Sequence, residues 1–265
     1  MIKLEERVGY EKELNAYIKQ EGMAVRLIGA IGKLLYDKGV ELVLFRNHLV
    51  SCNVSEILNL HIYAEKIVQK PIDVETTAQI AESIYELDIH PAKLDVGKLA
   101  SEWLSEKDSF SSMSDFLTSK LGFAMDKDVE PIEPKDVVLY GFGRIGRLAA
   151  RELIKQAGKG QQLRLRAVVT RDKKPEDLIK RAALLRNDSV HGAFQGTVIE
   201  DIENQSLIVN GQIIKFISAG NPEDIDYEQY GISDALIIDN TGVFKDREAL
   251  GRHLQAKGAS KVILT

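Results

Sequence analysis

Hydrophobic residues in the first 125 positions recur at three- and four-residue spacing, the spacing of one helix face. The pattern runs from Leu4 to Ile18 and again from Met23 to Tyr36. Further helices are expected over residues 55–70, 74–87 and 96–104, and from Ser112 or Ser114 to Leu121. We therefore expect residues 1–125 to form a small, mostly α-helical domain.

Capping residues support these predicted helices. Asp73 and Asp95 each precede one and can accept hydrogen bonds from its first amides. Gly122 is expected to end the last helix. Residues 40–45 alternate too poorly to decide between a strand and buried coil.

Residues 126–136 interrupt the helical pattern. They hold Pro131 and Pro134 among five acidic residues. Proline breaks a helix and charge keeps a segment in water, so these residues are expected to form a linker.

After the linker the pattern alternates between strands and helices. Residues 137–140 form a short apolar run, as a buried parallel strand requires, and residues 147–156 and 163–169 predict a helix and a second strand. A helix over 175–186, strands over 196–202, 205–209, 213–217, 235–239 and 261–265, a hairpin turn at Asn210–Gly211 and a helix over 246–257 ended by Gly258 are also expected. Residues 137–265 therefore predict an α/β, Rossmann-type domain with a mostly parallel sheet.

Composition and charge exclude several classes of protein. With 44% hydrophobic and 28% charged residues, the chain can bury two modest cores and is not disordered as a whole. A net charge of −5 argues against a dedicated nucleic-acid binder, and no basic–aromatic stripe supports RNA binding.

A single cysteine, Cys52, cannot form an internal disulfide, and the five histidines lack metal-motif spacing, so no metal site is expected. We expect Cys52 to be an inert structural thiol.

No membrane partner is expected either. The most apolar stretch, residues 23–50, is interrupted by six charged residues, and the N-terminus lacks the apolar core of a signal peptide. A cytoplasmic protein is the expectation.

The candidate chemistry begins at Gly141-Phe142-Gly143-Arg144-Ile145-Gly146, a GxGxxG sequence with a strand before it and a helix after it. In that context the first glycine allows a tight turn, the second lets the backbone approach a pyrophosphate, and the third lets helix and strand pack closely. Amides of the first helical turn then face the phosphates.

A side chain at the end of the second strand is expected to bind the adenosine ribose of the cofactor. An acidic residue there selects NAD, whereas arginine favours the 2′-phosphate of NADP. The strand ends Thr170-Arg171-Asp172, so both chemistries stand side by side and the choice between NAD and NADP stays open. Thr241 and Gly242 follow another buried strand, at the sheet edge where ligands bind in open α/β folds.

Five blocks carry a resemblance to the cofactor domain of glyceraldehyde-3-phosphate dehydrogenase over about residues 136–265: Tyr140–Arg147, Asn187–Gly192, Leu207–Gly211, Asn240–Phe244 and Lys261–Thr265. Residues 1–125 look like the extension of a longer bacterial branch of that family.

The resemblance implies that backbone atoms of Arg144 and Ile145 contact the pyrophosphate and that Arg171 or Asp172 binds the ribose. It places Thr241, Gly242 and Phe244 beside the nicotinamide and leaves His191 structural. The candidate cofactor-binding set is Gly141, Phe142, Gly143, Arg144, Ile145, Gly146, Thr170, Arg171, Asp172, Asn240, Thr241, Gly242 and Phe244.

The resemblance also implies an activity: D-glyceraldehyde 3-phosphate, phosphate and NAD(P)+ give 1,3-bisphosphoglycerate and NAD(P)H in glycolysis or gluconeogenesis. The family's catalytic cysteine and histidine follow the last strand seen here, so no catalytic residue is assigned and we expect the amino-terminal part of a longer enzyme. The phosphorylated aldehyde would be a partner only of that intact enzyme. The resemblance implies a homo-oligomer, since the family is usually tetrameric, and the oligomeric state of this chain stays open. The alternative is a non-catalytic dinucleotide-sensing or protein-interaction module.

Overall fold

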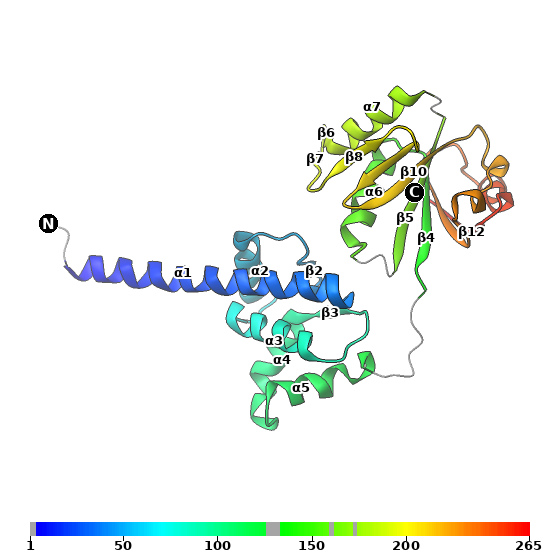
Figure 1. Ribbon diagram of the computed structural model, residues 1–265. Helices are drawn as coiled ribbons and strands as arrows, with labels where there is room; N and C mark the ends of the chain where they lie inside the picture. Colours follow the sequence, from blue (N-terminus) through cyan, green and yellow to red (C-terminus); the bar gives the residue numbers. More distant parts are fainter. Residues whose placement is uncertain (1–3, 126–132, 159–161, 172–173) are drawn as a thin grey trace. The chain divides into compact units, whose positions relative to one another are not determined.

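The computed structural model describes residues 4–125, 133–158, 162–171 and 174–265. The chain divides into two compact units, Met1–Glu130 and Pro131–Thr265 (Figure 1). Most of the predicted linker, residues 126–132, lies outside the described residues. Among the described residues, no helix is both long enough and apolar enough to cross a membrane.

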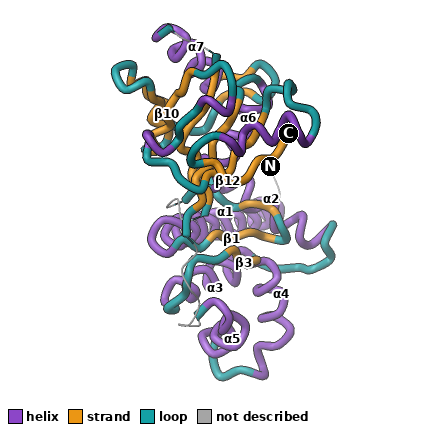
Figure 2. Tube along the Cα trace, turned by 90° about the vertical axis from the view of Figure 1, so that its right-hand side faces the viewer, coloured by secondary structure: helices purple, strands orange, loops and turns teal. Residues whose placement is uncertain are grey.

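The first unit is mostly helical. Its helices are α1 (Leu4–Lys33), which continues into a π-helical turn (Leu34–Lys38), α2 (Val54–Lys66), α3 (Val74–Glu86), α4 (Val96–Glu106) and α5 (Met113–Leu121). Short 3₁₀ turns follow α4 (Lys107–Ser109) and α5 (Gly122–Ala124). A small sheet has the order β2-β1-β3, formed by β1 (Glu41–Leu44), β2 (Asn47–His48) and β3 (Lys93–Asp95). In Figure 2, β1 and β3 run side by side, and they pair in parallel.

Two predictions about α1 and α2 were wrong. The pattern predicts separate helices over 4–18 and 23–36, but α1 is continuous, because residues 19–22 contain no proline and continue a helix that is exposed from residue 9 to residue 20. In Figure 1 this part of α1 extends beyond the other helices of its unit. Helix α2 begins at Val54 rather than Ser55, because Asn53 and Glu56 form a capping box.

The predicted caps of the helices in this unit were confirmed. Asp73, Asp95 and Ser112 cap α3, α4 and α5, and residues 41–44 form a strand, which settles the open choice at 40–45. Helix α5 ends before Gly122, although Gly122 keeps a right-handed φ of −49° and opens a 3₁₀ turn. The core is formed by large buried side chains that include Leu27, Leu34, Ile57, Ile80, Phe116 and Leu117. Trp103 packs on Phe116 with ring centroids 5.3 Å apart.

The second unit is an α/β domain with a seven-stranded sheet in the order β12-β11-β4-β5-β10-β9-β8. The five strands from β12 to β10 are parallel, and β9 and β8 are antiparallel. The strands are β4 (Lys135–Tyr140), β5 (Leu163–Thr170), β8 (Val198–Asp201), β9 (Ser206–Val209), β10 (Gln212–Ser218), β11 (Ala235–Asp239) and β12 (Ala259–Leu264). The helices are α6 (Arg144–Gln156), α7 (Pro175–Arg186) and α8 (Arg247–Gly251), with 3₁₀ turns at Pro222–Asp224, Glu228–Tyr230 and Arg252–Gln255.

Side chains of the buried strands alternate between two cores. Val137 and Leu139 of β4 pack with residues of α6 and α7, whereas Val138 and Tyr140 pack with residues from 217–256. Both faces of the parallel sheet are therefore covered, which explains the continuous apolar run of β4. The predicted Rossmann-type fold is confirmed.

Several element boundaries differ from the predictions. Helix α6 begins at Arg144 rather than Arg147, because Gly143 takes the N-cap place. The predicted helix over 246–257 is short, ending at Gly251 and followed by a 3₁₀ turn. A short hairpin, whose strands β6 (Asn187–Asp188) and β7 (Gly192–Ala193) have two residues each, was not predicted. The hairpin at Asn210–Gly211 was confirmed, and both residues take the positive φ of a type I′ turn, 48° and 79°.

Candidate functional site

A cleft of about 350 Å³ lies at the carboxyl ends of β4, β5 and β11. Eight of the predicted cofactor-binding residues line it: Gly141, Phe142, Gly143, Thr170, Arg171, Asn240, Thr241 and Phe244. Tyr140, Val169, Arg181, Ala219 and Val243, which the sequence did not single out, complete the lining. Three separate strand ends therefore bring the predicted residues together.

The remaining candidates lie elsewhere. Arg144, Ile145 and Gly146 form the first turn of α6, directly after the lining residue Gly143. Gly242 lies in the loop after β11, with φ +67°, and is not part of the lining. Asp172 lies outside the described residues.

The three glycines of the turn have different surroundings. Gly141 has φ +95°, and a Cβ there would lie 2.9 Å from Thr241 Cγ2. A Cβ on Gly146 would collide with the Gly141 carbonyl oxygen. A Cβ on Gly143 would meet nothing within 4 Å, so this glycine borders open space. The turn thus needs glycine at 141 and 146 for its own packing, whereas Gly143 leaves the cleft open for a ligand.

The first turn of α6 has the electrostatics of an anion site. Its N-cap, Gly143, has no side chain to accept hydrogen bonds from the first amides. These amides carry the partial positive charge of the helix dipole, because they have no carbonyl partner within the helix. A phosphate group bound there would accept hydrogen bonds from them.

The loop after β11 is held by Asp239. Its Oδ1 accepts hydrogen bonds from the Thr241 amide and hydroxyl, both 2.7 Å, and the Thr241 hydroxyl accepts one from the Val243 amide at 3.1 Å. Asp239 Oδ2 lies 2.8 Å from Nε2 of His253, and both side chains are fully buried. Burial alone would raise the pKa of Asp239, but the hydrogen bonds from His253 and Thr241 outweigh it and keep that pKa below its usual value.

Aromatic rings surround this buried pair. His253 packs edge-on against Tyr140 and Phe244, with centroids 4.6 and 5.0 Å away. Burial, and after it the nearby Asp239 carboxylate, raise the pKa of Tyr140 above its usual value. No motif in the sequence indicated the Asp239–His253 pair, although an acidic residue at the end of an apolar strand and a histidine in the following predicted helix could both be seen there.

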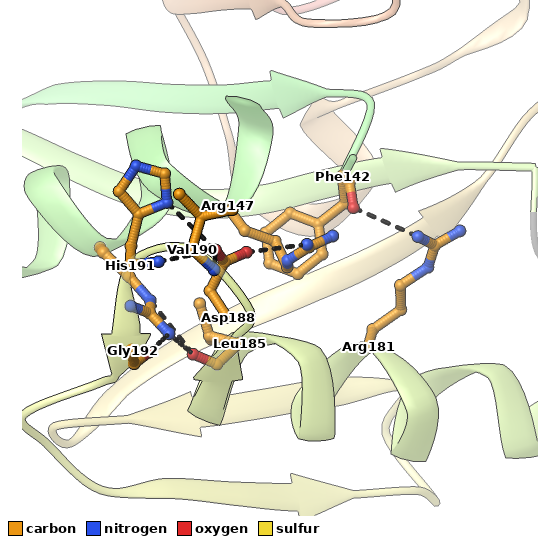
Figure 3. Close-up of polar contacts among 9 residues, drawn as sticks. Phe142, Arg147, Arg181, Leu185, Asp188, Val190, His191 and Gly192 are labelled. Carbon is orange, nitrogen blue, oxygen red and sulfur yellow. Dashed lines mark hydrogen bonds and ion pairs between the residues drawn. The ribbon is translucent and has the colours of Figure 1, made fainter. Parts of the chain in front are cut away.

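Two arginines, Arg171 and Arg181, line the cleft together with the loop after β11. Arg171 is exposed and comes directly after β5. Arg181 reaches from α7 and donates a hydrogen bond from Nη1 to the Phe142 carbonyl at 3.2 Å (Figure 3). The glycine turn is thereby tied to α7.

A second polar cluster supports α6 (Figure 3). Asp188 accepts hydrogen bonds from the Val190 and His191 amides and from His191 Nδ1, each 3.0 Å, and from Arg147 at 3.1 Å. These donors, led by the two amides, hold the pKa of Asp188 well below its usual range. His191 is part of this cluster and not of the cleft lining, in keeping with the expected structural role.

A larger cavity, about 810 Å³, lies at the other edge of the sheet. It is lined by residues at the amino ends of β5 and β10, including Arg164, Arg166 and Lys215. Ligands of open α/β sheets bind at the carboxyl ends of strands, and the glycine turn is absent from this lining. The smaller cleft is therefore the better candidate.

Residues 135–247 match the family of the glyceraldehyde 3-phosphate dehydrogenase NAD binding domain. The second unit therefore carries the NAD binding domain of that family. A glyceraldehyde-3-phosphate dehydrogenase-like protein of Pseudomonas aeruginosa is 41% identical over 242 residues, which is 90% of this chain and 52% of that protein. The chloroplastic glyceraldehyde-3-phosphate dehydrogenase A of Zea mays is 36% identical over 60% of this chain, and the enzyme of Streptococcus pyogenes is 37% identical over 49%.

The extent of these matches differs between the two units. An alignment of 242 residues must include most of the helical unit, so the Pseudomonas relative shares it. The chain spans about half the length of that relative and 37% and 35% of the other two. All residues that line the described cleft lie within the matched NAD binding domain.

Proposed function

We propose that this chain is the cofactor-binding part of a phosphorylating glyceraldehyde-3-phosphate dehydrogenase and binds NAD or NADP in the cleft at the glycine turn. The observation that carries the proposal is the open space at Gly143 beside the uncapped amides of α6. A dinucleotide diphosphate needs both features, because its oxygens must approach the backbone closely and accept hydrogen bonds.

The loop after β11 would form the nicotinamide side. Asp239 fixes the Thr241 amide and hydroxyl, and Phe244 is buried beside His253. These residues would hold the ring in one orientation and exclude water from one of its faces. The bound cofactor would supply the hydride-accepting ring, and this chain's residues would position it.

The aldehyde chemistry of the intact enzyme would depend on residues other than these 265. Cys52 lies in the helical unit, where its Sγ donates to the His48 carbonyl at 3.3 Å. It belongs to a different unit from the cleft. We propose that the nucleophilic cysteine thiolate and its histidine base belong to a longer protein of the length of the curated relatives.

Calorimetric titration of the 265-residue chain with NAD and with NADP tests the proposal. Binding of at least one dinucleotide is expected, with no reduction of either when glyceraldehyde 3-phosphate and phosphate are added. Failure to bind both would refute cofactor binding, and turnover would refute the assignment of catalysis to a longer protein. Reading the gene beyond codon 265 separates the enzyme from a non-catalytic dinucleotide-sensing module, since only the enzyme needs a following cysteine-containing segment.

A further inference from the structure

The described residues 9–20 of α1 lie outside the hydrophobic core of the helical unit. All of them are exposed, and this part of the helix extends beyond the other helices of its unit (Figure 1). One face of α1 enters the core only from Met23 onward. A helical segment of about 12 residues is marginally stable in water when nothing packs against it, so this segment favours a partner that covers it.

Large apolar side chains form a stripe along the exposed side of α1, which we call the α1 stripe. Its members are Tyr10, Leu14, Tyr17, Ile18 and Val25, with exposed fractions from 43% to 69%. At about 100° per residue, their positions fall within an arc of about 100°, the width of one helix face. The core residues Leu27 and Ala30 lie on the other side of the helix, so the α1 stripe faces away from the unit's own core.

The charges of this part of α1 favour a protein partner over a lipid surface. Residues 4–21 contain five glutamates but only three basic residues, Arg7, Lys12 and Lys19. Helices that lie on membranes carry an excess of lysine and arginine on their polar face, because they meet anionic lipids. The α1 stripe is therefore better suited to the apolar face of another helix.

The α1 stripe is complementary to itself in an antiparallel arrangement. In a twofold-symmetric pair whose axis passes between positions 17 and 18, each residue faces the residue of the other helix that lies equally far from the axis. Tyr10 then faces Val25, and Tyr17 faces Ile18, so that four apolar side chains of each copy become buried. We infer that two copies of this chain associate through their α1 stripes as an antiparallel helix pair.

The length of α1 sets the size of this contact. The two helices would overlap over positions 4–31, which is about 42 Å at 1.5 Å per residue. Since a helix is about 10 Å wide, the contact covers roughly 800 Å² over both copies, in the range of weak and reversible complexes. Each helical unit packs on the half of α1 that follows Met23, so the antiparallel pair places the two units at opposite ends. We expect a reversible dimer with a micromolar Kd.

Sedimentation equilibrium of the full chain tests the association between about 1 and 300 μM, the range in which a micromolar Kd is measurable. Wild-type protein is expected to shift reversibly from monomer to dimer. Ile18→Lys places an unpaired charge opposite Tyr17 twice in each dimer and should weaken association at least tenfold. Ile67→Lys is the matched control, because Ile67 is an exposed isoleucine of the same unit that lies outside α1. It should leave the Kd unchanged.

A second pair of variants tests the antiparallel register. In this register Leu14 faces Glu21 of the partner subunit, the one charged residue among the paired positions of the stripe. Leu14→Lys should keep most of the association, because its ammonium group meets that carboxylate. Leu14→Glu should dimerise at least tenfold more weakly than Leu14→Lys, because two carboxylates then face each other. A parallel pair would place position 14 opposite position 14, so both variants would weaken it equally.

Three outcomes would overturn the inference. A wild-type chain that stays monomeric over the whole concentration range would show that the α1 stripe binds something other than a second copy. A dimer that Ile18→Lys leaves intact would use another surface, and equal weakening by the two Leu14 variants would refute the antiparallel register. Circular dichroism of each variant checks that α1 remains helical. The measurements are made without dinucleotide, so their outcome does not depend on the proposed function.

Discussion

Two glycines of the turn, Gly143 and Gly146, have opposite surroundings. Gly146 has no room for a methyl group, because a Cβ would meet the Gly141 carbonyl oxygen. Gly143 has room for one, and the room lies in the cleft. The same substitution at the two positions therefore separates stability from binding.

Gly146→Ala should destabilise the second unit by about 1–3 kcal/mol, the usual range for overpacking in a buried site. Gly143→Ala should leave stability nearly unchanged, because Gly143 has an ordinary negative φ of −74°. It should lower dinucleotide affinity at least tenfold, since the methyl group would occupy the place of the diphosphate. Urea unfolding followed by circular dichroism and calorimetric titration measure the two effects. Unchanged binding in Gly143→Ala would contradict the placement of the diphosphate.

Asp188 gives the second unit a pH dependence. Its pKa is lower in the folded state than in the unfolded chain, where aspartate titrates near pH 4. Its contribution is therefore fully present above about pH 5 and is lost as pH falls towards the folded-state pKa. Asp188→Asn should be less stable than wild type at pH 7, and the difference should shrink between about pH 5 and pH 3.

Urea unfolding at several pH values measures that difference, with Asp108→Asn as a control because Asp108 is an exposed carboxylate in the other unit. A difference that stays constant over the acid range would show that Asp188 does not lose its proton more easily in the folded state.

For single residues, the sequence predicted most of those that line the cleft, but it did not predict the hydrogen bonds that hold them in place. The glycine pattern and strand ends were readable because their roles follow from local spacing. The Asp239–His253 pair was not, since its members are 14 residues apart and meet only when the segment after β11 folds back. Arg181 was also missed, because a charged residue on a helix ordinarily indicates a solvent-exposed face.

Among the elements, helix starts were readable where a side chain caps them. Asp73 accepts hydrogen bonds from the amide and the hydroxyl of Thr76, both 2.7 Å, at the start of α3. Helix α6 was misplaced by three residues because glycine at its N-cap offers no side-chain signal. The two-residue hairpin β6–β7 is too short to leave a periodic pattern.

Asp73→Ala should destabilise the helical unit by about 1 kcal/mol, whereas Asp73→Asn should cost less because asparagine is also a good N-cap residue. The unfolding midpoint in urea, read from the fluorescence of Trp103, measures the change in this unit. Equal effects of the two variants would show that the side-chain acceptor contributes little to α3.

The whole molecule is organised around separate hydrophobic cores. The helical unit has one core, and the two faces of the second unit's sheet have two more. Trp103, the only tryptophan, packs against the first core, so its fluorescence reports on the helical unit alone. The alternation of elements predicted the Rossmann-type unit, whereas the role of the helical unit is not encoded in any motif.

Saturating dinucleotide should raise the unfolding temperature of the second unit only. A ligand at a hundred times its Kd stabilises the unit that binds it by about 2.7 kcal/mol. The thermal transition seen by circular dichroism should therefore shift, and the transition seen by Trp103 fluorescence should stay in place. Equal shifts in both signals would mean that the two units unfold together.

The central claim is that the amides of the first turn of α6 bind the diphosphate of a dinucleotide. A crystal structure of the chain with NADP tests it most directly. The account predicts the diphosphate within hydrogen-bond distance of the amides of residues 144–146, over Gly143. A dinucleotide bound elsewhere, or a Gly141–Gly146 turn without a phosphate in contact, would contradict it.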